Sequence, residues 1–225
     1  MKKDQSIKQQ ADRKAKADRL DDENDTSLLE EILDFVKFFA ICAIAILLFI
    51  NFIAKPVTVV SHSMDPNLAD GEVGFTGIIQ NMFRANERGD IVVVKMKDDN
   101  GNDSHWVKRI IGLPGETIEA TGGTVYINGQ PLDESAYLNQ EFMQTELNEI
   151  NAAMKDSNTG QSFQYGTFQD DFGPVTLGAD EYFVMGDNRP KSKDSRYSSV
   201  GPVTKEQIVG TGMLVIYPFN QFGIK

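Results

Sequence analysis

Two residues, Ser63 and Lys108, could together carry out nucleophilic catalysis. Ser63 lies in the segment VVSHSMDP (59–66), where a β-like run leads into a turn constrained by Pro66. A serine hydroxyl in such a turn can be presented at the surface, but it needs a neighbouring base to become a nucleophile. The sequence offers two candidate bases, His62 and Lys108.

His62 is adjacent to the serine, but successive strand residues point to opposite faces, so its imidazole is not expected to reach the hydroxyl. Lys108 lies in HWVKRII (105–111), where alternation places Trp106, Lys108 and Ile110 on one face. An ammonium group beside these apolar side chains is partly desolvated, which lowers its pKa. By itself this pattern still favours a lysine on a solvated strand face, and one serine with one lysine does not make an enzyme.

A third polar segment, GDNRPKSKDSR (186–196), follows the apolar run at 182–185. Its turn formers and charges are typical of a surface loop when the segment is considered alone. The alternative is a polar clamp, in which Asp194 pairs with an arginine and Ser192 holds the amine of Lys108.

These residues follow a long apolar segment. Residues 38–54 read FFAICAIAILLFINFIA, with Asn51 the only polar residue and Lys37 and Lys55 at the two ends. With three more residues before it, the run reaches about 20 residues, the length that crosses a bilayer as a helix. It follows a polar tail, and no clean small-x-small cleavage site comes after it. We therefore expect a retained transmembrane anchor at 35–55, not a buried core helix or a cleaved signal peptide.

The distribution of basic residues predicts how this anchor is oriented. Residues 1–37 contain eight Lys and Arg, whereas the next basic residue after Lys55 is Arg84. Basic residues favour the cytoplasmic side of a membrane. We expect a polar tail at 1–34 in the cytoplasm and a domain at 56–225 outside it, in a single-pass protein of the cell membrane.

Composition excludes several other functions. The formal net charge is −11, and residues 56–225 hold 13 basic and 23 acidic residues. This acidity opposes nucleic-acid binding, which requires phosphate neutralisation by Lys and Arg. The chain has one cysteine, Cys42, and two histidines, and no group of them has the spacing of a zinc site. We expect neither a metal nor a cofactor.

The domain at 56–225 is predicted to be mostly β. Short β-like runs are separated by turn signals and lack alternating helices, which favours an antiparallel sheet. A polar stretch at 134–172, with one short helix at about 140–155, indicates an inserted lobe within about 117–181. The β-like runs are 57–60, 90–94, 106–111, 124–127, 182–185 and 212–217.

Four stretches, taken together and in this order after an N-terminal anchor, resemble the type I signal peptidase family, the bacterial leader peptidases. The resemblance covers residues from about 35 to 220, and the single anchor with its short insertion is similar to Gram-positive members. The stretches are SHSMDPNL (61–68), RGDIVVVK (88–95), VKRIIGLPGE (107–116) and GDNRPKSKDSR (186–196).

The resemblance implies a role for each polar residue at a matching position. Ser63 would be the nucleophile and Lys108 the general base of a Ser-Lys protease. The supporting residues would be Ser61, which forms the oxyanion hole with the Ser63 amide, Ser192, which orients Lys108, and Asp194 with Arg196, which form a bracing ion pair.

The same resemblance implies shallow pockets for small substrate side chains, lined by Met64, Leu68, Trp106 and Val107. Two residues depart from the family pattern. Asn67 stands where threonine is usual, and His62 where glycine is common. Both lie away from the catalytic atoms, so they affect the expected substrate preference and leave the expected activity unchanged.

The implied function is a membrane-bound serine endopeptidase that cuts after small-x-small sites in signal peptides. Its partners would be secretory preproteins and the lipid bilayer, near the protein-export translocon. One alternative is a LexA-like self-cleaving Ser-Lys protease, which the anchor and the acidic charge oppose. Another is a non-catalytic, membrane-tethered binding module, which the intact Ser63 and Lys108 pair opposes.

Overall fold

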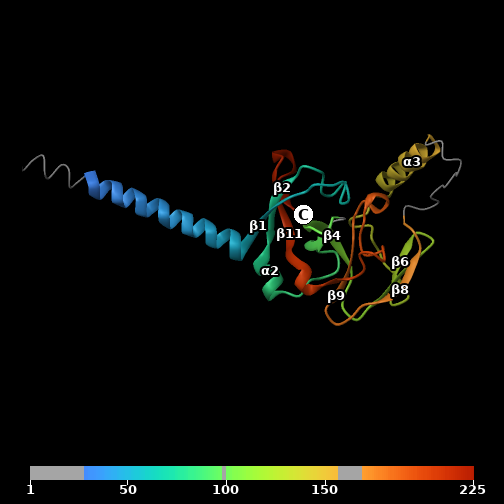
Figure 1. The fold of residues 1–225 in the computed structure, drawn as a ribbon. Helices are drawn as coiled ribbons and strands as arrows, with labels where there is room; N and C mark the ends of the chain where they lie inside the picture. Colours follow the sequence, from blue (N-terminus) through green and yellow to red (C-terminus); the bar gives the residue numbers. More distant parts are fainter. Residues whose placement is uncertain (1–27, 98–99, 157–168) are drawn as a thin grey trace, which may run out of the picture. The chain divides into compact units, whose positions relative to one another are not determined.

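A computed structural model describes residues 28–97, 100–156 and 169–225 of the chain (Figure 1). Most of the predicted tail, residues 1–27, therefore lies outside the described residues. The chain divides into two compact units, Met1–Phe49 and Ile50–Lys225.

The N-terminal helix runs over Leu28–Ile53, and its last five residues, Phe49–Ile53, form a π-helical turn. Its most apolar window has a mean hydropathy of 2.6, and none of that window is buried against protein. By length and composition the helix can cross a membrane. An apolar helix without protein cover is typical of a membrane span.

Most of the second unit is an eight-stranded sheet with antiparallel pairing throughout, in the order β1-β2-β11-β3-β4-β9-β10 with β12 added beside β11 (Figure 1). The predicted mostly-β, antiparallel architecture is confirmed. The strands are β1 (Ala54–Thr58), β2 (Val73–Gly77), β3 (Ile91–Lys97), β4 (Asp103–Gly112), β9 (Glu181–Met185), β10 (Val203–Thr204), β11 (Ile208–Tyr217) and β12 (Gly223–Ile224).

A second, four-stranded sheet and the longest helix of this unit fall within residues 117–181. The sheet order is β7-β6-β5-β8, and the helix α3 (Gln140–Asp156) is the short helix expected at about 140–155. Only one of these strands, β6, was predicted. The others are short and rich in Thr, Gly and Pro, so they lack a clear apolar alternation. The strands are β5 (Thr117–Thr121), β6 (Thr124–Ile127), β7 (Gln130–Pro131) and β8 (Phe172–Thr176).

Four short helical segments connect the strands. One is α-helical, α2 (Ile78–Phe83), and follows β2 directly. The other three are 3-10 turns: η2 (Arg189–Lys191), η3 (Lys205–Gln207) and η4 (Phe219–Gln221). Of these, η2 lies inside the polar segment 186–196 that the sequence singled out.

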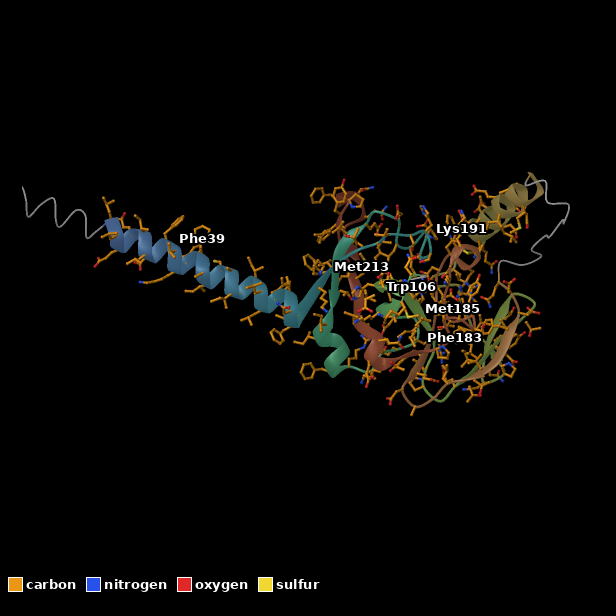
Figure 2. All side chains as sticks on the ribbon, viewed as in Figure 1. Phe39, Trp106, Phe183, Met185, Lys191 and Met213 are labelled. Carbon is orange, nitrogen blue, oxygen red and sulfur yellow. The ribbon has the colours of Figure 1, made fainter. Side chains whose placement is uncertain are left out.

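Buried apolar side chains cover both faces of the large sheet, because alternate residues of β3 belong to different clusters. Ile91 and Val93 pack with Met64 and Leu68, whereas Val92 and Val94 pack with residues of β4 and β9. A third cluster joins the two sheets, and includes Phe183 and Met185 (Figure 2). The first cluster matters most for function, because it anchors the turn that carries Ser63.

Candidate active site

Ser63 lies in a turn that both the sheet and a distant loop hold in place. The side chains of Met64 and Leu68 are fully buried in the first core cluster, and the amides of Asn67 and Leu68 both donate to the Met64 carbonyl at 3.0 Å. From the other side, the Asn188 amide donates to the Ser63 carbonyl at 3.0 Å. The turn begins where β1 ends at Thr58, two residues earlier than the strand predicted at 57–60.

Lys108 reaches the Ser63 hydroxyl from β4. Its Nζ lies 2.7 Å from Ser63 Oγ and 3.2 Å from the Val107 carbonyl oxygen. The two residues are 45 positions apart in sequence, and each is nearly inaccessible: Ser63 is 6% exposed and Lys108 4%. The Lys108 amine also lies 5.7 Å from the centroid of the Trp106 ring. The fold thus brings the two residues into direct contact in a site that excludes most water.

Burial lowers the pKa of Lys108 from 10.5 to about 8. Desolvation of the ammonium group is the main cause; the Arg196 charge adds to it, and the Asp194 and Asp187 carboxylates oppose it. Among the described residues, the Lys108 amine bonds to a hydroxyl and a carbonyl and to no carboxylate. A lysine in this environment can lose its proton near neutral pH, as a general base must.

Ser61 lies next to the nucleophile candidate. Its Oγ is 3.0 Å from Ser63 Oγ, and the Ser63 amide donates to it at 3.4 Å. The Ser61 hydroxyl and the Ser63 amide therefore occupy the same small region. Two donors so close to a serine hydroxyl are the arrangement that an oxyanion hole needs.

Asp194 and Arg196 form a buried ion pair with two hydrogen bonds. Arg196 Nε lies 2.8 Å from Asp194 Oδ1, and Nη2 lies 2.9 Å from Oδ2. The Gly186 amide also donates to the Asp194 carboxylate at 2.9 Å. Burial acts to raise the pKa of Asp194, but the Arg196 charge and these hydrogen bonds outweigh it and hold the pKa below its usual value.

Ser192 is buried, but the structure does not place its hydroxyl on the lysine. A Cβ at Gly186 would come within 2.2 Å of Ser192 Oγ and 2.4 Å of the Ser63 carbonyl oxygen, so only glycine fits between them. Ser192 Oγ lies beside the Asp194 carboxylate and helps to lower its pKa without a hydrogen bond of regular geometry. Within the described residues, the expected hydrogen bond from Ser192 to Lys108 is absent.

Three of the four residues expected around the substrate line a cleft of about 400 Å³ that opens onto Ser63 and Lys108. Met64, Trp106 and Val107 border this cleft, whereas Leu68 is fully buried in the core and lies outside its wall. The complete lining is Thr58, Val59, Val60, Ser61, Ser63, Met64, Ser104, His105, Trp106, Val107, Lys108, Lys191 and Lys193.

His62 points away from the dyad. Its side chain is 65% exposed, and its Nδ1 lies 2.8 Å from Asp65 Oδ2. The imidazole therefore contacts Asp65 and not the Ser63 hydroxyl, although residues 61–67 form a bend and a turn and not the strand from which this was argued.

A buried polar network beneath the site was not predicted. Arg109 forms two hydrogen bonds with Asp187, at 2.8 and 2.6 Å, and stacks over the Tyr137 ring at 4.5 Å. Asn67 donates to the same Asp187 carboxylate at 2.8 Å and to the Tyr137 carbonyl at 2.7 Å. Asn67, one of the two departures from the family pattern, thus ties the Ser63 turn to the inserted lobe.

The inserted lobe also binds Arg189, the first arginine of the 186–196 segment. Arg189 pairs with Glu134 and donates to Gln169 Oε1 at 2.5 Å. These partners lie 55 and 20 positions away in the chain, and no local motif marks them. Sequence alone could identify the arginine as part of a polar segment, but it could not identify its partners.

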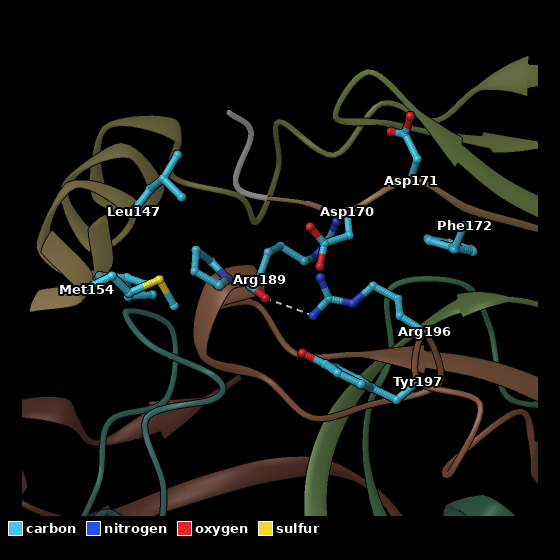
Figure 3. Close-up of a pocket in the computed structure, with 10 residues that line it drawn as sticks. Leu147, Met154, Asp170, Asp171, Phe172, Arg189, Arg196 and Tyr197 are labelled. Atoms are coloured by element: carbon cyan, nitrogen blue, oxygen red, sulfur yellow. Dashed lines mark hydrogen bonds between the residues drawn. The ribbon is translucent and has the colours of Figure 1, made fainter. Parts of the chain in front are cut away.

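A second cavity, of about 330 Å³, lies behind this segment (Figure 3). It is bordered by Leu147 and Met154 of α3, by Phe172, and by Arg189 and Arg196. Arg196 donates across it to the Arg189 carbonyl at 2.8 Å. Both of its arginines are paired with carboxylates, and among the described residues that line it there is no candidate nucleophile with an adjacent base.

Within the ranges 28–97, 100–156 and 169–225, no group of three or more His, Cys, Asp or Glu side chains could hold a metal ion.

Comparison with known proteins identifies relatives along most of the chain. Signal peptidase I S of Bacillus subtilis (strain 168) is 42% identical over 192 residues, which cover 85% of this chain and 92% of the relative. Signal peptidase IB of Staphylococcus aureus (strain COL) is 33% identical over 199 residues, 86% and 93% of the two chains. A crystal structure of a signal peptidase I from Enterococcus faecalis V583 covers 56% of this chain and 96% of its own, with 30% identity and a TM-score of 0.37.

The family described as signal peptidase, peptidase S26, matches residues 32–217. This range holds all four stretches on which the sequence resemblance was based, and the resemblance is confirmed. The chain belongs to the signal peptidase family, peptidase S26.

Proposed function

We propose that this chain is a membrane-bound serine endopeptidase that removes N-terminal signal peptides from exported preproteins, with Ser63 as nucleophile and Lys108 as general base. Membership of the family supports the reaction. The observation that carries the assignment of residues is the 2.7 Å contact between Ser63 Oγ and a buried Lys108 amine that lacks a carboxylate partner.

In the first step, neutral Lys108 takes the Ser63 proton while the serine oxygen attacks the carbonyl carbon at the cleavage site. With a pKa of about 8, roughly one lysine in ten is neutral at pH 7. The Ser63 amide and the Ser61 hydroxyl would donate to the oxyanion that forms. The Ser61 hydroxyl now faces Ser63 Oγ, so it would turn its proton toward the oxyanion.

The remaining steps use the same amine. Protonated Lys108 gives its proton to the leaving amine, the peptide bond breaks, and an acyl-enzyme ester on Ser63 remains. Lys108, neutral again, accepts a proton from water, which attacks the ester and releases the signal peptide. Lys108 then gives this proton to the Ser63 oxygen as the ester bond breaks, so both residues return to their starting states.

Asp194, Arg196 and Ser192 are assigned to support of the site. The Asp194–Arg196 pair binds the Gly186 amide and the carbonyls of the 189–192 turn. Gly186 and Ser192 in turn contact the Ser63 carbonyl region. We assign Ser192 to this support of the nucleophile's turn in place of a direct bond to the Lys108 amine.

The side chains that form the cleft wall determine which substrate side chains fit beside Ser63. Val107, Met64 and Trp106 leave a shallow apolar surface beside Ser63. Small side chains fit there, so substrates would carry small residues one and three positions before the cut. Such sites occur at the ends of secretory signal peptides.

The proposed topology follows the family and the apolar helix. Residues 35–55 would span the cell membrane once, with the tail 1–34 in the cytoplasm and the catalytic domain 56–225 outside, including a lobe at about 117–181. In this topology the active site would lie outside the cytoplasm, near the translocon, where preproteins emerge. Protease added outside intact protoplasts should digest residues 56–225 and spare the tail. Protection of the large domain would overturn this topology.

Cleavage of a secretory preprotein by the full chain in detergent tests the activity. The account predicts a single cut after a small-x-small site, identified by N-terminal sequencing of the product, and no cut with Ser63→Ala. No cleavage by the wild-type chain would favour the binding-module alternative, and cleavage of the chain itself would favour a self-cleaving protease.

A further inference from the structure

One residue of the inserted lobe, Tyr137, contacts the supports of both members of the dyad. It lies between β7 and α3 and packs on the third core cluster. Its carbonyl oxygen accepts a hydrogen bond from Asn67 at 2.7 Å, and the Arg109 guanidinium carbon lies 4.5 Å from the centroid of its ring. Asn67 is four residues after Ser63, and Arg109 directly follows Lys108. Tyr137 thus touches both the turn of the nucleophile and the strand of the base.

The ring contact is one of several that fix the Arg109 side chain. Its Nε and Nη2 donate to the Asp187 carboxylate at 2.8 and 2.6 Å, and its Nη1 donates to the Gly89 carbonyl at 2.7 Å. The Tyr137 ring adds a cation–π contact, which attracts the guanidinium and covers it with apolar surface. The ring therefore helps to hold Arg109 in the place where it meets Asp187.

Asp187 links this arginine to the turn of the nucleophile. Its carboxylate, which is 1% exposed, accepts hydrogen bonds from Arg109 and, at 2.8 Å, from Asn67. The next residue, Asn188, donates its amide to the Ser63 carbonyl at 3.0 Å. The strand of the base and the turn of the nucleophile therefore meet at one buried carboxylate, and a shift of Arg109 would change how they are placed.

The distance that depends on this placement is the one between the reacting groups. Lys108 and Arg109 are neighbours on β4, so their side chains point to opposite faces of the strand. Lys108 borders the cleft and lies 2.7 Å from Ser63 Oγ, whereas Arg109 meets Tyr137 on the other side. Proton transfer requires a separation of about 3 Å, and a misplacement of about 1 Å can slow a reaction about 100-fold.

We propose that the Tyr137 ring positions the dyad: by holding Arg109 on Asp187, it keeps the Lys108 amine within hydrogen-bond reach of the Ser63 hydroxyl. This inference rests on the proposed function. It gives the inserted lobe a role in the reaction, although none of the described residues 117–156 and 169–181 lines the cleft that opens onto the dyad.

The Tyr137 hydroxyl makes a separate contact. It donates to Glu134 Oε1 at 2.8 Å, and Glu134 pairs with Arg189. Burial and the Glu134 charge raise the pKa of Tyr137, so the phenol stays protonated and neutral. Because the hydroxyl contacts Glu134 and the ring contacts Arg109, different substitutions can remove the two contacts separately.

The test measures kcat and KM of the full chain in detergent, per amount of folded protein, for a peptide with a small-x-small site. Tyr137→Leu removes the ring and should lower kcat about 10- to 100-fold, with KM within about threefold of the wild-type value. Tyr137→Phe keeps the ring, so its kcat should stay within about fivefold of the wild-type value. Tyr126→Leu, at a half-buried tyrosine of β6 in the same lobe, is the matched control and should leave kcat unchanged.

The pH dependence of kcat/KM distinguishes positioning from a loss of folded protein. A displaced Arg109 would let water reach the Lys108 amine, so in Tyr137→Leu the rise of kcat/KM should move to higher pH. Partial unfolding would instead lower kcat/KM by the same factor at every pH. The charged groups around this amine are unchanged in the variant: Asp194, Arg196 and Asp187 act on its charge, and Lys191 and Lys193 border its cleft.

The outcomes separate this inference from the proposed function. Tyr137→Met, which keeps a long apolar side chain on the third core cluster, replaces Tyr137→Leu if the leucine variant does not fold. A wild-type kcat in either variant, or a lowered kcat with an unchanged pH dependence, would overturn the positioning role and leave the peptidase standing. So would a Tyr137→Phe enzyme as slow as Tyr137→Leu. No cleavage of any peptide or preprotein by the wild-type chain would overturn both.

Discussion

Two kinds of buried basic side chain lie within one domain of this protein. Arg109, Arg189 and Arg196 each pair with a carboxylate, Asp187, Glu134 and Asp194 respectively. Lys108 is buried like Arg109 and Arg189, yet its amine bonds to a serine hydroxyl and a backbone carbonyl. Each arginine charge is matched by a carboxylate, whereas desolvation lowers the pKa of Lys108 to about 8 and lets this amine lose its proton near neutral pH.

The paired arginines support the structure of the site, whereas Lys108 can take part in the reaction. A paired arginine fixes geometry through two directed hydrogen bonds and cannot accept a proton. An unpaired buried lysine is costly in its charged form, and that cost lowers its pKa into the range of a useful base. The two cavities differ in the same way, since the basic residues that border the one behind the 186–196 segment are the paired Arg189 and Arg196. Cavity size alone would not have distinguished them.

The largest expected effect comes from removing either member of the dyad. Ser63→Ala and Lys108→Ala should each lower kcat/KM for a preprotein by roughly 10⁴-fold or more, because nucleophile and base act as one unit. The double variant should be little worse than either single variant. Thermal unfolding of the full chain in detergent would verify that the variants fold. Processing close to the wild-type rate by either one would contradict the assignment.

Breaking an arginine pair should instead reduce stability. Asp194→Asn leaves Arg196 buried without a carboxylate, which costs about 3–5 kcal/mol of unfolding free energy. The loss of activity should follow the loss of folded protein. Combining it with Arg196→Met removes the uncompensated charge and should recover part of that stability. A stable Asp194→Asn protein without activity would assign Asp194 to the chemistry.

A smaller effect is expected where the Ser63 turn meets the inserted lobe. Asn67→Ala removes the hydrogen bonds to the Asp187 carboxylate and the Tyr137 carbonyl, at a cost of about 1–3 kcal/mol. Urea unfolding would measure it, with Asn67→Asp as a second variant, which leaves no donor for either acceptor. Unchanged stability in both would show that Asn67 does not hold the turn.

The smallest effect is expected at the histidine beside the nucleophile. His62→Ala removes an exposed contact with Asp65 and should leave kcat/KM within about twofold of the wild-type value. A folded but inactive His62→Ala enzyme would point to a serine–histidine mechanism. Lys108 would then not be the base, and its difference from the paired arginines would not explain the activity.

Sequence reasoning identified Ser63 and Lys108 as candidates because they lie in motifs whose residue types suit acyl transfer, and it predicted the sheet from its apolar runs. It missed β2, β5 and β8, whose short, polar-rich segments become strands through pairing with distant neighbours. Nor could it find Tyr137, whose ring and carbonyl complete the network beneath the site.

The contact expected between Ser192 and Lys108 is not among those that the structure shows, and the orienting role of Ser192 stays a prediction. A motif fixes which residues lie close in sequence, but the direction of a buried hydroxyl depends on the backbone around it. Here the close approach at Gly186 places Ser192 Oγ beside the Ser63 carbonyl and the Asp194 carboxylate. The same contact explains why the polar segment 186–196 is buried at several positions although its composition is that of a surface loop.

The central claim is that Lys108 acts as a neutral amine, and the pH dependence of kcat/KM tests it most directly. The active form lacks the proton, so activity should rise tenfold per pH unit below the pKa and level off above about 8. Trp106→Ala admits water to the Lys108 amine and should move the rise of kcat/KM to higher pH. Lys108→Arg cannot deprotonate near neutral pH and should be inactive. If kcat/KM kept rising up to the ordinary lysine pKa of 10.5, or if the Lys108→Arg enzyme were active, the account would be contradicted.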